Sequence, residues 1–335
     1  MSNPMKILFT VPTGYNRDKY FPPKLMARLE SLGEVIKNPH SRQYAREELK
    51  VLLPDADIII THWGSTQYDA ELLDCAPNLK LLAHCAGTVA HIASEACYER
   101  GIPVLSANPI MAKYVAEGAL AYMLAGIRAI RAYDGNMRVG LWHQNMPQTN
   151  TIVGGEIGLI GLGAVGRNLL DMLRPFGCTV KVYDPYLPDG ALDAWEFASA
   201  VSFEEAMKNP VVSIHASQTP ETYHMVNAEA LALMPDDALL VNTARGSLID
   251  MEALIPELQS GRLRAVLDVY EREGCPQDER LLACTDKLTL QPHLAGMPSG
   301  SAMTAAIIDD LERFLGGEPL KLAVSHTQYL HMTQE

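Results

Sequence analysis

The segment that decides the fold of this 335-residue chain is Glu156-Ile157-Gly158-Leu159-Ile160-Gly161-Leu162-Gly163-Ala164-Val165-Gly166. Ile157 to Ile160 form an apolar strand, and the G-x-G-x-x-G sequence that follows opens a helix ending near Pro175. In such a turn the first glycine permits a sharp bend, the second lets a ligand approach the main chain, and the third lets helix and strand pack closely. The segment predicts an α/β fold built on a doubly wound parallel sheet.

A carboxylate follows the glycine turn at a meaningful distance. The next predicted strand, Thr179–Tyr183, ends at Asp184, which lies 18 residues after Gly166. The start of the helix would face a pyrophosphate, and Asp184 would accept hydrogen bonds from ribose hydroxyls. No Arg or Lys follows in Pro185-Tyr186-Leu187-Pro188 to bind a 2′-phosphate, so the motif predicts NAD rather than NADP. The alternative is a glycine-tight turn in an α/β core that binds no cofactor.

Short apolar runs alternate with helix-length amphipathic segments along the chain, a pattern typical of parallel sheets with crossover helices. Four strands in the first third of the chain are predicted to form one small sheet, with helical segments such as Lys24–Ser31 between them. These strands are Lys6–Val11, Asp57–Thr61, Leu79–His84 and Val104–Leu105. Six further strands suit a complete dinucleotide fold: Glu156–Ile160, Thr179–Tyr183, Val211–Ile214, Leu239–Val241, Arg264–Leu267 and Leu288–Leu290.

The length of the chain favours two domains. A long helical pattern runs from Ala112 to about Tyr133, and we place a domain boundary just before it. The last helical pattern, 301–315, is long enough to leave the second sheet and pack on the first. The prediction is therefore a smaller flavodoxin-like substrate domain, residues 1–108 and 302–335, and a Rossmann NAD-binding domain, residues 109–301.

Composition excludes several classes of function. The net charge of −13 disfavours a nucleic-acid partner, because a polyanion would be repelled. Residues 1–6 lack the pattern of a signal peptide, and no run of about 18 apolar residues predicts a membrane span. The cysteines show no C-x-x-C pairing and are expected to be buried free thiols in a reducing cytoplasm, at positions 75, 85, 97, 178, 275 and 284.

Three successive strand ends carry residues suited to chemistry. They are Asn242-Thr243-Ala244-Arg245-Gly246, then Asp268-Val269-Tyr270-Glu271-Arg272-Glu273, then Gln291-Pro292-His293-Leu294-Ala295-Gly296. Ligands of such sheets bind at the carboxyl ends of the strands, so an arginine, a carboxylate and a histidine are expected to meet there. Each also has a structural interpretation: Arg245 could cap a helix or pair with Asp250, His293 could be structural, and the glutamates could form a solvated turn.

These three segments, with the glycine turn and Asp184, resemble the D-isomer-specific 2-hydroxyacid dehydrogenase family. The resemblance covers almost the whole chain, because further matching stretches are Gly101-Ile102-Pro103-Val104, Val115-Ala116-Glu117 and Thr219-Pro220-Glu221-Thr222. It implies an NAD-dependent oxidoreductase that moves a hydride between NAD(H) and C2 of a small D-2-hydroxy or 2-keto acid, similar to glyoxylate and hydroxypyruvate reductases.

The resemblance also implies roles for individual residues. Arg245 would bind the substrate carboxylate and polarise the C2 oxygen, and His293 would be the general acid and base. Glu273 would orient His293, although the nearby Glu271 is an alternative. Substrate contacts would come from Arg245, His293, Ala86, Gly87 and Thr88. Cofactor contacts would come from Gly161, Gly163, Ala164, Val165, Gly166, Asp184, Pro185, Thr243, Ala244, Arg245, Asp268, His293 and Gly296; no metal is expected.

The chain departs from the family pattern at three places, one of which is the turn at Ser217-Gln218, where a proline common in the family is replaced. Glu273 is followed by Gly274-Cys275-Pro276, where the family usually has proline directly after the glutamate. The loop His84–His91 lacks the family's usual acidic residues, although the backbone N–H groups of Gly87 and Thr88 remain as donors. His91 is expected to be an exposed loop residue, or alternatively a new polar contact to the substrate.

Two other functions are compatible with the predicted fold and site, and one further segment predicts an assembly. An NAD-sensing regulatory or scaffold protein would share the fold, and a formate or phosphite dehydrogenase would share the arginine and histidine. The apolar helix predicted at 112–133, with the segment 138–142, predicts a homodimer formed through the nucleotide-binding domains.

Overall fold

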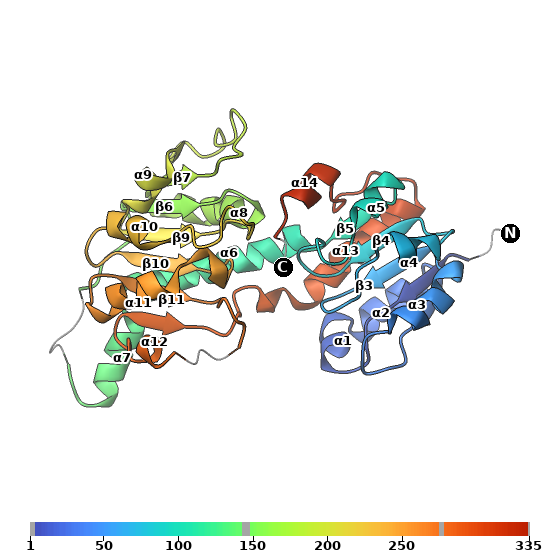
Figure 1. Ribbon diagram of the computed structural model, residues 1–335, viewed down its shortest axis with the longest axis horizontal. Helices are drawn as coiled ribbons and strands as arrows, with labels where there is room; N and C mark the ends of the chain where they lie inside the picture. Colours follow the sequence, from blue (N-terminus) through green and yellow to red (C-terminus); the bar gives the residue numbers. More distant parts are fainter. Residues whose placement is uncertain (1–3, 143–147, 275–277, 334–335) are drawn as a thin grey trace. The chain divides into compact units, whose positions relative to one another are not determined.

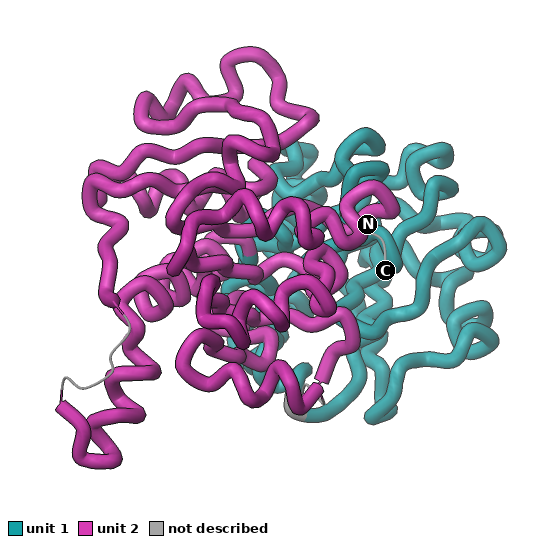
Figure 2. The backbone as a smooth tube through the Cα atoms, turned by 60° about the vertical axis from the view of Figure 1, so that its left-hand side comes forward, with its two compact units in different colours: residues 1–111, 299–335 teal, residues 112–298 magenta. Residues whose placement is uncertain are grey.

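The computed structural model describes residues 4–142, 148–274 and 278–333 (Figure 1). The chain divides into two compact units, unit 1 with residues 1–111 and 299–335, and unit 2 with residues 112–298 (Figure 2). The boundaries expected from the sequence, after residues 108 and 301, lie three residues from these two junctions.

Unit 1 contains a five-stranded, entirely parallel sheet in the order β2-β1-β3-β4-β5. This is the flavodoxin-like order, in which the direction of winding reverses between β1 and β3. The strands β3 and β4 are buried along their whole length, as expected where helices cover both faces of a parallel sheet. The strand β2 was missing from the predicted set. The bounds are β1 Lys6–Phe9, β2 Glu34–Lys37, β3 Ile58–Thr61, β4 Leu81–His84 and β5 Val104–Ser106.

The helix α13 (Gly300–Leu315) belongs to unit 1 although it follows unit 2 in the chain. Its buried residues Met303, Ile307 and Leu311 share one core with Ile7 and Phe9 of β1. The sequence-based expectation that this helix returns to the first sheet describes the same arrangement. The other helices of unit 1 are α1 Tyr15–Tyr20, α2 Pro23–Glu30, α3 Arg46–Leu52, α4 Ala70–Asp74, α5 Glu95–Glu99 and α14 His326–Leu330.

Unit 2 contains a seven-stranded parallel sheet in the order β12-β11-β10-β9-β6-β7-β8. Strands β8 to β11 reproduce the 3-2-1-4-5-6 order of a Rossmann fold, and β12 extends one edge. The prediction of two doubly wound parallel-sheet domains is confirmed, but the count of six strands was wrong because β8 was missed. The bounds are β6 Glu156–Ile160, β7 Thr179–Tyr183, β8 Ala198–Ala200, β9 Val211–Ile214, β10 Leu239–Asn242, β11 Arg264–Leu267 and β12 Leu288–Leu290.

The single helix predicted for 112–133 was wrong. The helix α6 spans Asn108–Ile127, and a separate helix, α7, spans Ile130–Arg138. Between them Ala129 has a φ of +50°, a left-handed conformation that an α-helix does not contain. The remaining helices of unit 2 are α8 Ala164–Leu173, α9 Phe203–Met207, α10 Ala228–Leu233, α11 Met251–Gln259 and α12 Glu279–Leu282.

The helix α6 is long and apolar enough to cross a membrane by length and composition alone. Its residues Ala116, Ala119 and Met123 are buried in the core of unit 2, together with Ile157 and Leu159 of β6. Such packing is that of a core helix, which passes the same test of length and composition.

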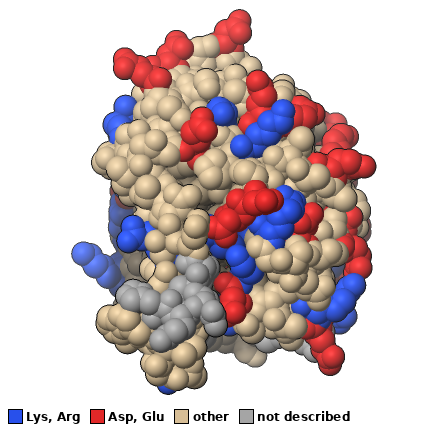
Figure 3. Space-filling view, turned by 90° about the vertical axis from the view of Figure 1, so that its left-hand side faces the viewer, with Lys and Arg blue, Asp and Glu red and all other residues tan. Residues whose placement is uncertain are grey.

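On the face seen in Figure 3, acidic and basic side chains are interspersed. Several basic side chains of unit 2 are paired, as in the ion pairs of Arg280 with Glu252 (2.6 Å) and Asp278 (2.7 Å). A surface of mixed sign does not attract a polyanion over a distance.

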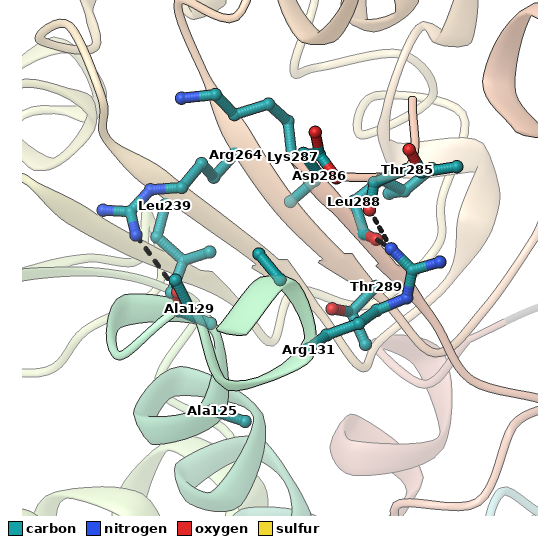
Figure 4. A pocket seen from close by; sticks show the side chains of 13 residues that line it. Ala125, Ala129, Arg131, Leu239, Arg264, Thr285, Asp286, Lys287, Leu288 and Thr289 are labelled. Atoms are coloured by element: carbon teal, nitrogen blue, oxygen red, sulfur yellow. Dashed lines mark hydrogen bonds between the residues drawn. The ribbon is translucent and has the colours of Figure 1, made fainter. Parts of the chain in front are cut away.

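A small cavity of about 20 Å³ lies at the amino ends of β10, β11 and β12 (Figure 4). The buried guanidinium of Arg264 donates hydrogen bonds to the carbonyl oxygens of Gly126 and Ile127, and so caps the last turn of α6. Arg131 donates to the carbonyl oxygen of Leu288 across the cavity (3.3 Å). The cavity has room for about one water molecule. It lies at the amino ends of the strands, whereas the candidate site lies at their carboxyl ends.

Of the cysteines, Cys85, Cys97, Cys178 and Cys284 are buried free thiols, and Cys75 is a partly exposed free thiol. Cys275 lies outside the residues that the structure describes.

Candidate active site

The candidate residues of unit 2 follow the carboxyl ends of its strands. Along the edge of the sheet, His293 follows β12, Asp268 follows β11 and Arg245 follows β10, while Gly161 follows β6 and Asp184 follows β7. Neighbouring strands lie about 4.8 Å apart, so the ends of β10 and β12, which the turns of Arg245 and His293 follow, are about 10 Å apart. The predicted cofactor and reaction residues therefore share one edge of a single sheet.

The glycine turn crosses the point where the strand order reverses, between β6 and β9. Gly161 has a φ of +96°, and a Cβ atom there would lie 2.7 Å from the backbone nitrogen of Ala216, just after β9. A Cβ atom on Gly166 would lie 2.6 Å from the carbonyl oxygen of Gly161, so this glycine lets α8 pack against the turn. Gly163, in contrast, is exposed and has no atom within 4 Å of the Cβ position. Gly161 and Gly166 are thus required by the fold, whereas Gly163, the middle glycine of the motif, leaves open space beside the turn.

The open space at Gly163 fits a pyrophosphate. Gly163 is the N-cap of α8 and offers no side-chain cap, so the first-turn N–H groups of Ala164, Val165 and Gly166 point toward this space. Asp184 lies beside the turn, and its carboxylate accepts hydrogen bonds from the N–H groups of Leu162 (2.8 Å) and Tyr186 (2.9 Å). Pro185 follows it and is exposed. These residues are suited to hold the diphosphate and ribose of a dinucleotide.

The turn that carries Arg245 is fixed by Asn242. The side chain of Asn242 is fully buried, accepts from the N–H of Ala244 (3.0 Å) and donates to the carbonyl oxygen of Arg245 (2.8 Å). Within the same turn, Nη1 of Arg245 donates to the carbonyl oxygen of Ala244 (2.8 Å). Asp250 caps α11 by accepting from the N–H of Glu252. Asn242 belongs to the segment 242–246 that the sequence singled out. Its positioning role was not predicted, because its hydrogen bonds form only in the folded turn.

Close packing joins the turn after β10 to the turn after β11. Gly246 lies so near the backbone of Tyr270 and Glu271 that any Cβ atom would overlap both. The hydroxyl of Thr243, on the same turn, is buried and has no hydrogen-bond partner among the described residues. A polar atom of this kind marks a place where a ligand or a water is needed.

The structure distinguishes the two glutamates. Oε1 of Glu273 lies 3.4 Å from Nδ1 of His293, and both side chains are about half exposed. Glu271 instead accepts a hydrogen bond from the hydroxyl of Tyr223 (2.9 Å) and lies 3.5 Å from Nε2 of His224. The carboxylate beside the candidate acid is therefore that of Glu273.

Asp268 makes more contacts than the sequence indicated. Its carboxylate is fully buried and accepts hydrogen bonds from the N–H groups of Leu294 (2.8 Å) and Ala295 (3.0 Å) and from the hydroxyl of Tyr122 (3.2 Å). These bonds tie it to the loop that carries His293. Gly296 lies in the same loop.

In unit 1, the loop expected to contact substrate follows β4. Ala86 and Gly87 are buried and Thr88 is partly exposed. The carbonyl oxygen of Gly87 accepts from the hydroxyl of Ser106 (2.5 Å), which fixes the loop against the end of β5. Within the described part of the chain, the N–H groups of Gly87 and Thr88 donate no hydrogen bond. They are therefore available to an acceptor such as a carboxylate.

Three histidines of unit 1 have buried ring nitrogens, and of these only His91 was singled out from the sequence. Nε2 of His62, Nε2 of His84 and Nδ1 of His91 are buried and have no hydrogen-bond partner among the described residues. Burial lowers the pKa of His62 to about 4 and holds the pKa of His84 well below its usual range. His91 is partly buried, so the expectation of an exposed loop residue was wrong. Across the described ranges, no group of three His, Cys, Asp or Glu side chains is arranged to hold a metal ion.

Comparison with known proteins finds relatives in the family that the sequence resembles. The family model described as "D-isomer specific 2-hydroxyacid dehydrogenase, NAD binding domain" matches residues 120–295. The D-3-phosphoglycerate dehydrogenase of Methanocaldococcus jannaschii is 32% identical over 87% of this chain and 55% of its own length. The chain thus spans about half the length of that relative. The hydroxypyruvate reductase of Thermotoga maritima is 32% identical over 82% of this chain and 88% of its own length.

Among solved structures, the D-lactate dehydrogenase of Aquifex aeolicus, complexed with NAD and lactic acid, matches with a TM-score of 0.70 and 25% identity. The match covers 93% of this chain and 96% of that one. The resemblance noted from the sequence and the expected NAD-binding domain are both confirmed. The chain belongs to the D-isomer-specific 2-hydroxyacid dehydrogenase family.

Proposed function

We propose that this chain is an NAD-dependent oxidoreductase that transfers a hydride between NAD(H) and C2 of a small D-2-hydroxy or 2-keto acid. The observation that carries the proposal is the pairing of His293 with Glu273 on the sheet edge that also holds Arg245 and the Gly161 turn. We infer that residues 109–301 hold the cofactor and that the remaining residues contribute the substrate loop.

Arg245 is proposed to bind the substrate carboxylate. A guanidinium presents two parallel N–H groups that match the two oxygens of a carboxylate, and its charge also polarises the nearby C2 oxygen. Ala86, Gly87 and Thr88 of unit 1 are proposed to add contacts to substrate, with the N–H groups of Gly87 and Thr88 as donors. Glyoxylate and hydroxypyruvate are the proposed substrates, because a small acid needs few contacts beyond its carboxylate and carbonyl.

His293 is proposed to supply the proton. When bound, NADH supplies the hydride, and negative charge then develops on the C2 oxygen. His293 donates a proton to this oxygen in reduction and accepts it in oxidation. Glu273 positions the ring through Nδ1, so that Nε2 faces the C2 oxygen. The remaining family contacts, Pro185, Thr243, Ala244, Asp268 and Gly296, are proposed to line the cofactor site with Asp184.

The test is NADH oxidation by the purified chain with glyoxylate, hydroxypyruvate, pyruvate and bulkier 2-keto acids. Turnover is expected with the small acids, and His293→Gln should lower kcat by about 10²-fold or more while keeping the Kd for NADH. The matched control is His40→Gln, since His40 also lies near a glutamate, Glu48 at 3.6 Å, but in unit 1. NADH binding without turnover would indicate an NAD sensor, and turnover of formate or phosphite with NAD would indicate the other class of dehydrogenase.

A cytoplasmic location and a homodimer complete the proposal. The helix α7 carries exposed apolar side chains, Ile130 (57% exposed) and Met137 (51%), and Val139 (71%) follows it. In Figures 1 and 2 this helix projects from the body of unit 2. A second copy that covers this surface would remove these side chains from water.

A further inference from the structure

The backbone of His293 is held in a strained conformation. Its φ is +55°, in the left-handed region that residues with a side chain rarely adopt. Such a conformation costs free energy and persists only where the surrounding structure fixes it. The groups that fix it are therefore of interest, because they set the position of the proposed acid.

Asp268 fixes this loop at three consecutive residues. Its carbonyl oxygen accepts from the N–H of His293 (2.8 Å), and its carboxylate accepts from the N–H groups of Leu294 and Ala295. The carboxylate is fully buried, so these bonds to an ionised acceptor are shielded from water. The loop itself is at the surface, since Leu294 is 41% exposed. A surface loop is thus anchored by a buried charge.

One face of helix α6 also contacts Asp268 and the loop that carries His293. The hydroxyl of Tyr122 donates to the carboxylate of Asp268 (3.2 Å). Burial, followed by the charge of Asp268, raises the pKa of Tyr122, so the hydroxyl keeps its proton and remains a donor. Gly118 is one turn earlier on the same face, and a Cβ atom there would lie 2.8 Å from Cα of Ala295. Helix α6 therefore contacts both the anchor and the loop.

We propose that Asp268, Tyr122 and Gly118 are positioning residues that hold the loop 293–296 in the geometry from which His293 reacts. This inference rests on the proposed function, since it assigns the acid's position to groups that His293 does not touch through its side chain. It differs from a contact of Asp268 with the nicotinamide carboxamide, because an anchor acts before any cofactor is bound.

The first measurement uses the chain without cofactor or substrate. Amide hydrogen exchange of Leu294 and Ala295 should be slow in the unmodified chain, despite the exposure of Leu294, because both N–H groups bond to a buried carboxylate. In Asp268→Asn, which keeps the shape but loses the charge, exchange at both residues should accelerate by about tenfold or more. In Tyr122→Phe it should accelerate by about threefold to tenfold. Tyr114→Phe, on the same helix, is the matched control and should leave exchange unchanged.

The second measurement is kinetic. Tyr122→Phe and Gly118→Ala should lower kcat by about threefold to tenfold, while the KM for the keto acid and the Kd for NADH stay within about twofold. A residue that only stabilised the fold would lower the melting temperature without this split between kcat and KM.

The outcomes distinguish a failure of the loop anchor from a failure of the proposed dehydrogenase activity. If no substrate turns over, amide exchange in the cofactor-free chain still decides whether the anchor exists. Unchanged exchange in Asp268→Asn together with a Kd for NADH raised tenfold would overturn the anchor and assign Asp268 to the carboxamide. Unchanged exchange and unchanged kcat in Tyr122→Phe would overturn the role of α6.

Discussion

Glu273 and His293 lie on turns that follow adjacent strands, and a distance of 3.4 Å joins Oε1 of the first to Nδ1 of the second. Glu273→Gln should therefore lower kcat about tenfold, because an amide accepts from Nδ1 less strongly than a carboxylate and fixes the orientation of the ring less well. Steady-state kinetics with NADH and the best small keto acid measures this. Glu271→Gln is the matched control, since Glu271 bonds to Tyr223, and should change kcat less than twofold. Equal losses in the two variants would contradict the assignment.

The first two glycines of the turn should respond differently to a methyl group. Gly161→Ala should lower the free energy of unfolding by about 2 kcal/mol or more, because its φ is +96° and Ala216 leaves no room. Gly163→Ala should lower it by only about 1 kcal/mol or less, the cost of alanine at a helix N-cap, since the space there is open. It should nevertheless raise the Kd for NADH about tenfold by filling the approach of the pyrophosphate. Denaturant unfolding and NADH fluorescence titration measure the two effects. A Gly163→Ala variant with normal NADH affinity would argue against a cofactor at this turn.

Asp184 should decide between the two nicotinamide cofactors. Asp184→Asn removes the charge that would repel a 2′-phosphate, so the ratio of kcat/KM for NADH to that for NADPH should fall on the order of tenfold to 100-fold. The N–H groups of Leu162 and Tyr186 bond to different oxygens of Asp184, so the asparagine keeps one of the two bonds, which limits damage to the fold. Asp189→Asn, on the exposed loop that follows, should leave the ratio unchanged. A ratio that does not move in Asp184→Asn would place the ribose elsewhere.

Buried histidines should make the chain sensitive to acid. The pKa values of His62 and His215 are lowered by burial to about 4, whereas an unfolded chain protonates histidine near pH 6.5. The unfolded state binds more protons between these values, so stability is full above pH 6.5 and is lost as the pH falls toward 4. Each histidine should cost about 2 kcal/mol of unfolding free energy between pH 7 and pH 5.

The contribution of His62 can be isolated. His62 lies among Tyr20 and Trp63, with ring centroids 4.6 and 4.5 Å away, so His62→Phe suits its surroundings. This variant should lose about 2 kcal/mol less than the unmodified chain between pH 7 and pH 5, as measured by urea unfolding. His326→Phe replaces an exposed histidine and should leave the pH dependence as it was. The same pH dependence in all three proteins would mean that His62 does not titrate as burial requires.

The proposed homodimer should be disrupted by a charge on the α7 surface. Val139→Glu places a carboxylate on a side chain that is 71% exposed in one copy and would be buried between two. Sedimentation should then show monomers where the unmodified chain forms dimers. Val51→Glu, on a side chain of unit 1 that is 79% exposed, should leave the dimer intact. Dimers that persist in Val139→Glu would place the interface elsewhere.

Strong local patterns in the sequence predicted most of the fold. Strands such as Val211–Ile214 are short, mostly apolar runs between helices, and the bounds of this strand matched the structure. The strands that were missed, β2 and β8, lie at sheet edges and are short or polar, Glu34-Val35-Ile36-Lys37 and Ala198-Ser199-Ala200. Edge strands need only one apolar face, so hydrophobicity does not mark them. The residue at the break, Ala129, is neither glycine nor proline, so its left-handed conformation is not indicated by its type.

The candidate site was predictable where a residue type carries its own chemistry. Arg245 and His293 stand out because charged and titratable groups follow apolar strands, and the resemblance assigned their roles. The choice between Glu271 and Glu273 was not accessible, because it depends on which way a six-residue turn folds. The bond from Tyr122 to Asp268 joins residues 146 positions apart, and no local pattern indicates it.

The placement of α13 has a consequence for biosynthesis. Residues 112–298 form one uninterrupted unit that can fold as soon as the ribosome has released it, whereas the sheet begun by β1 lacks Met303, Ile307 and Leu311 until α13 emerges. Domains made early usually fold early during translation. Here the order is reversed, because the strands of unit 1, made before unit 2, keep apolar surface uncovered until α13 has also been made.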